Sequence, residues 1–320
     1  MAQPGDLEPD GARPGAADWA GTPRGQSPPA AAPPYATPPP RPAPWSPPAG
    51  RPRAAPVDSG GNVAFLDRPG APPVTRGDGG MWLFFAVLGF LFGQIAGFVL
   101  VLVAAAIAGQ AGQLASIAKL SAPPEWYVGA SLVGLWIGFF LGPLIASMTR
   151  GTRHLAKDLG LRFEVIDLVG IAIGIGGQIM VAIMYAPFAQ HLKNFNAPTT
   201  KLTGASHGGG FAVIAVMTVV GAPFFEELFF RGLILRGLVR VLAPSRPGRS
   251  AARAVAVTAA VLLDGLIFGA AHAELVQLAG LAAFGAVLAF VSYRTGRLGM
   301  NMVAHASFNL IAVVAILQSR

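Results

Sequence analysis

Residues 81–108 read MWLFFAVLGFLFGQIAGFVLVLVAAAIA, a run without a single charged side chain. An α-helix needs about 20 consecutive apolar residues to cross the hydrocarbon core of a bilayer, so this run predicts a membrane-spanning helix. Six further apolar runs follow, at about 126–148, 165–187, 211–235, 252–272, 276–293 and 298–318. The sequence therefore predicts an all-α fold, a polytopic transmembrane helical bundle of about seven spans.

Composition supports this fold class. The chain has 320 residues, of which 53% are hydrophobic and 12% are charged, whereas a soluble domain carries about 25% charged residues. Cysteine is absent from the sequence, which excludes disulfides, cysteine proteases and thiolate zinc sites. The net charge of +8 lies mostly in loops, so we interpret it as a topology signal and expect no nucleic-acid partner.

Residues 1–80 differ in composition from the rest of the chain. They contain twenty of the 28 prolines, with Ala, Gly and Arg between them. Such a segment cannot bury enough apolar surface to offset its ordering entropy, so it predicts a disordered tail. The alternative is a docking segment for a Pro-binding partner. Residues 81–154 then form two N-terminal transmembrane helices.

The basic residues of the loops predict an orientation. Connections rich in arginine and lysine alternate along the chain with connections poor in them, and the rich connections are expected to be cytoplasmic. The tail is then cytoplasmic and the C-terminus outside, in a multi-pass protein of the cell membrane. The rich side carries Arg68, Arg76, Arg150, Arg153, Lys157, Arg162, Arg236, Arg240, Arg246, Arg249, Arg253, Arg294 and Arg297, and the poor side only Lys119, Lys193, Lys201 and Arg320.

Glycine spacing in the first span predicts close helix packing. Gly89, Gly93 and Gly97 recur every four residues on one helix face. Small residues at this spacing allow two membrane helices to approach closely. This pattern concerns architecture and carries no chemistry.

Few ionisable residues lie within the spans, and burying one in a membrane is costly, so each is a candidate for function. Glu226 and Glu227 are adjacent in PFFEELFFRG, residues 223–232, and adjacent residues project about 100° apart on a helix. Glu227 is four residues before Arg231, which allows an ion pair. Glu226 then points elsewhere and is available as a general base. The alternative is a Glu–Arg pair used for packing alone, which leaves Glu226 unexplained.

Two further spans carry histidine. His272 shares a face with Asp264 and Phe268, or is an interfacial residue at the end of its span. Asp264 is either a second partner for Arg231 or a satisfied core carboxyl.

The last span carries a second histidine. His305 and Asn309 are four residues apart, so both side chains project from one face. They could supply donors for an oxyanion, a metal ligand, or an interhelical hydrogen bond.

The order of these motifs resembles a known family. Glu226-Glu227 with Arg231, then Phe268 with His272, then His305 with Asn309, is similar to the CAAX protease and bacteriocin-processing (CPBP, or Abi) family, which includes the type II CAAX prenyl endopeptidases. The segment Lys157–Arg162 also looks like the loop before this core. The resemblance covers about 155–315 and identifies 155–320 as the intramembrane protease core.

The resemblance implies an intramembrane endopeptidase that cleaves membrane-associated proteins or peptides. Glu226 and His272 would activate a water molecule, and His305 and Asn309 would stabilise the oxyanion. Glu227 and Arg231 would hold the site. No cofactor is expected, because Glu226 and His272 supply a base without one. In the zinc alternative the ligands are Glu226, His272 and His305.

Two other functions compete with the peptidase. A non-catalytic immunity or scaffold protein of the same fold predicts the loss of a motif residue, and every motif residue is present. A proton-coupled transporter predicts internal repeats with interrupted helices in both halves. The ionisable span residues instead lie only in the C-terminal half.

Residue counting places the candidate residues at different depths in the membrane. His305 is expected near the middle of its span and Glu226 on the inner side of the centre, whereas His272 is expected nearer the outer end.

Overall fold

The predicted class and number of spans are confirmed. A computed structural model describes residues 76–188, 190, 208–243 and 251–318. These residues form helices without strands, and seven helical segments are long and apolar enough to cross a membrane. The chain is an integral multi-pass membrane protein. The predicted disordered tail lies outside the described residues, apart from its last few positions at the start of α1. The spans are Asp78–Ile107, Glu125–Arg150, Val165–Phe188, Gly208–Leu242, Ala251–Ala271, Leu278–Thr295 and Gly299–Gln318.

The first two spans pack against each other over most of their length. They are helices α1 (Arg76–Ile107) and α3 (Glu125–Arg150), joined through η2 (Ala111–Gln113) and α2 (Leu114–Ile117). The glycines of α1 meet glycines of α3, and a Cβ on Gly138 would overlap the carbonyl oxygen of Gly89. The close approach predicted from the glycine spacing is confirmed, since no side chain separates the two backbones here.

The fourth span is longer than predicted. It runs unbroken through α7 (Gly208–Val216), π-helix η5 (Met217–Gly221), α8 (Ala222–Glu227), π-helix η6 (Leu228–Ile234) and α9 (Leu235–Leu242). The prediction that Arg236 and Arg240 lie in a loop is therefore wrong. Both side chains are buried in α9, because each finds a partner within the bundle. Arg236 donates to the carbonyl oxygen of Leu159 at 2.6 Å, and the Arg240 guanidinium lies 3.8 Å from the Trp82 ring centroid.

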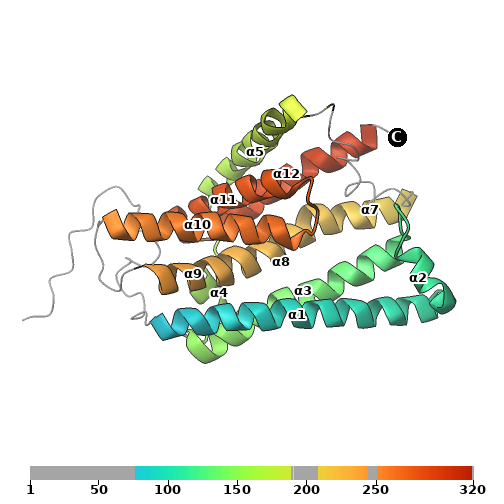
Figure 1. The fold of residues 1–320 in the computed structure, drawn as a ribbon, viewed down its shortest axis with the longest axis horizontal. Helices are drawn as coiled ribbons and strands as arrows, with labels where there is room; N and C mark the ends of the chain where they lie inside the picture. Colours follow the sequence, from blue (N-terminus) through green and yellow to red (C-terminus); the bar gives the residue numbers. More distant parts are fainter. Residues whose placement is uncertain (1–75, 189, 191–207, 244–250, 319–320) are drawn as a thin grey trace, which may run out of the picture. The chain divides into compact units, whose positions relative to one another are not determined.

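The remaining helices cover the other side of this span. The chain passes through α4 (Leu155–Leu159) and η3 (Val165–Leu168) into α5 (Val169–Tyr185) and η4 (Ala186–Phe188). Helices α10 (Ala251–Ala271) and α11 (Leu278–Thr295) pack together, and α12 (Gly299–Gln318) packs against α5. In Figure 1 the α7–α9 span lies between the α1–α3 pair and helices α10–α12. The helix with both glutamates is thus central.

Aromatic side chains hold the central span in place. The ring of Phe139 on α3 stacks on that of Phe229, with centroids 4.1 Å apart and planes 9° apart. The Trp136 ring lies 5.0 Å from that of Phe225, at 17°. Stacked rings fix helix register as well as burying apolar area. The side of the span that faces α3 is therefore closed by rings from outside the motif-bearing helices.

Candidate active site

The two glutamates sit between two π-helices. In η5 the N–H of Ala222 donates to the carbonyl of Met217, five residues back, and in η6 that of Leu235 donates to Phe230. Short π-helical segments inside α-helices occur often at functional sites. Pro223, which has no backbone N–H, stands at the start of α8, directly after η5.

Glu227 is the centre of a buried hydrogen-bonded cluster. Its Oε1 accepts from Arg231 Nη1 at 2.9 Å and lies 3.0 Å from His305 Nδ1. Glu227 and Arg231 have no exposed side-chain surface. The predicted ion pair between them is confirmed. Arg231 neutralises this carboxylate, and the side chains of His305 and Asn301 also contact its oxygens.

Glu226 points to a different partner. Its Oε2 lies 3.8 Å from His305 Nε2, and its side chain keeps 13% of its surface exposed. Among the described residues, this buried oxygen has no hydrogen-bond partner. His305 stands between the two glutamates, with Nδ1 on Glu227 and Nε2 toward Glu226. Glu226 is therefore the carboxylate that remains available to a water molecule or a ligand.

His272 lies one residue beyond the end of α10 and is exposed. Its Nδ1 is 2.8 Å from the carbonyl oxygen of Phe268, and a carbonyl only accepts, so Nδ1 carries the proton and Nε2 is the open nitrogen. The Phe268 ring contacts both imidazoles, with centroid distances of 4.8 Å to His272 and 5.6 Å to His305. The described residues show no direct contact between His272 and Glu226, and His305 is the imidazole beside this carboxylate.

Asn309 is tied to the helix that carries the glutamates. Its Nδ2 donates to the carbonyl oxygen of Thr218 at 2.8 Å. Ala222 N–H, the usual α-helical donor to Thr218, bonds Met217 instead, and Pro223 has no N–H. Asn309 thus satisfies a carbonyl that the proline leaves open, and one N–H of its amide remains available.

The site also includes a residue that the motif analysis did not single out. Asn301 lies one turn before His305 on α12 and has no exposed surface. Its Nδ2 donates to Glu227 Oε2 at 3.3 Å and to the Leu288 carbonyl at 2.6 Å. The spacing Asn301–His305–Asn309, four residues each, was the available signal.

The zinc alternative requires Glu226, His272 and His305 to converge on one ion. Across the part of the chain that the structure describes, no group of three or more His, Asp or Glu side chains is placed to hold a metal ion. These three residues do not fit a zinc site in this arrangement.

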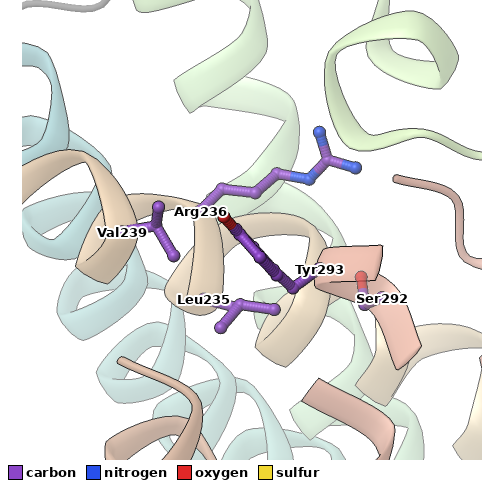
Figure 2. A pocket seen from close by; sticks show the side chains of 5 residues that line it. All are labelled: Leu235, Arg236, Val239, Ser292 and Tyr293. Atoms are coloured by element: carbon purple, nitrogen blue, oxygen red, sulfur yellow. The ribbon is translucent and has the colours of Figure 1, made fainter. Parts of the chain in front are cut away.

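A small pocket lies elsewhere, between α9 and α11. Figure 2 shows its lining, and the Arg236 guanidinium extends away from Leu235 and Val239. That guanidinium is engaged by the carbonyl oxygens of Asp158 and Leu159 at 2.9 and 2.6 Å. The pocket holds none of the motif residues, so we assign it no role in the chemistry. It is lined by Leu235, Arg236, Val239, Ser292 and Tyr293.

Fold and site together define a class: a multi-pass helical membrane protein with ionisable side chains gathered inside its bundle. Residues 208–311 match the family described as Type II CAAX prenyl endopeptidase Rce1-like. This match confirms the predicted family, and its range contains all three motifs. The family is one of proteases, which supports peptidase activity in general terms. No curated protein and no solved structure gives a match.

Proposed function

We propose that this protein is an intramembrane endopeptidase that hydrolyses peptide bonds of membrane-associated proteins or peptides, in the manner of CAAX processing. One observation carries the proposal. The Glu226 carboxylate lies inside an apolar bundle without a hydrogen-bond partner on Oε2, 3.8 Å from an imidazole fixed by a second glutamate. Burying a carboxylate inside a membrane protein is costly, so its presence here supports a functional role.

Glu226 acts as the general base. It takes a proton from a water molecule as the water oxygen bonds to the carbonyl carbon of the scissile peptide. His272 assists through its open Nε2, since Nδ1 is occupied by the Phe268 carbonyl. This role requires His272 to approach Glu226 when substrate binds.

His305 and Asn309 stabilise the tetrahedral intermediate. Both lie on one face of α12, and a negative charge on the former carbonyl oxygen is stabilised by fixed donors. Glu227 accepts from His305 Nδ1, so Nε2 is the nitrogen directed to the reaction, and it donates to the oxyanion in the form of His305 that carries a proton on both ring nitrogens. When the C–N bond breaks, the proton held by Glu226 passes to the leaving amine. Water is consumed, and a carboxylic acid and an amine are formed.

The loop charges favour an orientation in which the N-terminal tail is cytoplasmic. In the proposed orientation, substrates are anchored in the same membrane and reach Glu226 from within the bundle. The tail is a candidate docking segment for a Pro-binding partner.

The proposal is tested by comparing membrane peptides in cells that express wild-type protein or Glu226→Ala. Peptides that depend on the wild-type protein and disappear with Glu226→Ala are the expected products. Purified protein is then assayed on the precursors of those peptides. Glu125→Ala is the matched control, because it removes a carboxylate at the start of α3, away from the motif residues.

The expected result is that Glu226→Ala abolishes cleavage while membrane insertion and the folded yield are unchanged. Equal cleavage by purified wild-type and Glu226→Ala protein would remove Glu226 from the mechanism. Identical peptide sets in all strains would instead favour the non-catalytic scaffold.

A further inference from the structure

Arg231 contacts its own helix and two others, α10 and α11. Its Nη1 donates to Glu227 one turn back on its own helix, and its Nη2 donates to the Gly285 carbonyl of α11 at 2.9 Å. The face of the guanidinium lies 4.4 Å from the Phe268 ring centroid. The remaining edge, Nε, faces Asp264 on α10, with 3.4 Å between Nε and Oδ2.

Asp264 is fully buried and lies outside the three motifs. It has no exposed side-chain surface, and among the described residues neither of its oxygens has a hydrogen-bond partner, so the Arg231 Nε edge meets it only as an ion pair at 3.4 Å. Burying a carboxylate without a strong partner costs several kcal/mol. A lone leucine here would fill the space without that cost, so Asp264 requires an explanation.

The geometry of Arg231 supplies one. A guanidinium prefers to bind a carboxylate through two parallel N–H groups, one to each oxygen. Here Arg231 donates to Glu227 through Nη1 alone, because Nε faces Asp264 and Nη2 donates to the Gly285 carbonyl of α11. Glu227 Oε1 therefore also lies 3.0 Å from His305 Nδ1, while Oε2 is left for Asn301.

We propose that Asp264 is a positioning residue, whose contact with the Nε edge of Arg231 keeps Glu227 available to hold His305. Without it, Arg231 turns onto Glu227 through two N–H groups and competes with His305 for the same carboxylate. His305 then loses the partner that fixes the proton on Nδ1 and directs Nε2 toward Glu226. This role rests on the proposed peptidase function only for its effect on rate.

The test reads the His305 imidazole directly. Long-range nitrogen–proton spectra of histidine-labelled protein in detergent show which ring nitrogen carries the proton, with His305→Gln used to assign the signal. Wild-type protein is expected to show a protonated Nδ1. Asp264→Ala removes the counter-charge beside Arg231 Nε and is expected to lose this form. It is expected to lower kcat by about 10- to 100-fold, the range for residues that orient a reactive group, with KM nearly unchanged.

Asp264→Asn keeps an oxygen at nearly the same place, although a neutral amide attracts the Arg231 guanidinium less strongly than a carboxylate does. It is expected to lie between wild type and Asp264→Ala in both measurements. This near-isosteric variant also decides the matter if Asp264→Ala does not fold. Asp158→Asn is the matched control, a buried carboxylate bound to Ser147 at 2.6 Å and remote from His305.

An unchanged His305 spectrum in Asp264→Asn, or in folded Asp264→Ala, overturns the positioning role. So does an equal change in Asp158→Asn, which would show a general effect of losing a buried charge. If the wild-type protein cleaves nothing, the proposed function fails while the spectra still decide the role of Asp264. The two ideas are thus separable.

Discussion

The adjacent glutamates should respond in opposite ways to the same truncation. We expect Glu227→Ala to lower the free energy of unfolding substantially and Glu226→Ala to leave it nearly unchanged. The pair is a matched comparison, because the two residues share a helix and a side-chain type. Glu227 has no exposed side-chain surface and Glu226 has 13%. A difference in burial this small does not account for the expected difference in stability.

The magnitudes follow from their partners. Truncating Glu227 leaves Arg231 buried with only Asp264 at 3.4 Å as a counter-charge, and breaking a buried ion pair costs about 3–5 kcal/mol. The contacts from His305 and Asn301 are lost too, each worth about 0.6 kcal/mol in a membrane protein. Glu226 has only the 3.8 Å approach to His305, so its truncation should change stability by less than about 1 kcal/mol.

The measurement is equilibrium unfolding of detergent-solubilised protein with increasing SDS, followed by tryptophan fluorescence. Glu227→Ala/Arg231→Met should recover part of the loss, because the double variant no longer buries an unpaired cation. Equal destabilisation by Glu226→Ala and Glu227→Ala would refute the division of roles between the two residues. So would a Glu227→Ala variant as stable as wild type.

Three other changes test separate parts of the structure. Gly138→Leu should destabilise the protein by about 1–3 kcal/mol in the same assay, because its side chain overlaps the backbone at Gly89; an unchanged midpoint would contradict the close packing of α1 and α3. Arg236→Met should cost about 1–3 kcal/mol, since the carbonyls of Asp158 and Leu159 lose their guanidinium donor, and full stability would show that these contacts are dispensable. Strong chelators should leave the cleavage rate unchanged, and a loss that added zinc restores would contradict the metal-free mechanism.

The number of spans was predictable because each apolar run is long enough to cross a membrane on its own. The length of the fourth span was not. Arg236 and Arg240 follow the apolar run and suggest a loop by composition, yet both are buried through contacts with α4 and α1. Those partners lie far away in the sequence, so no local sequence pattern predicts the contacts.

The site was predictable only where spacing along one helix decides contact. Glu227 and Arg231 are four residues apart, and their ion pair followed from helix geometry alone. Spacing does not say which helix faces which, so the question of Asp264 stayed open until α10 was placed beside Arg231. The approach of His305 to Glu226 likewise depends on how α12 packs.

The proposed difference in role between Glu226 and Glu227 depends on more than the motif. Two neighbouring residues must project in different directions, and each direction must lead to a different environment. Glu227 points to donors from α12 and from its own helix. The aromatic rings of α3 close the other side of the span, through Phe139 on Phe229 and Trp136 on Phe225. Because α3 lies outside the segment that matches the family, part of the packing that holds the glutamate-bearing span comes from residues that the family's motifs do not describe.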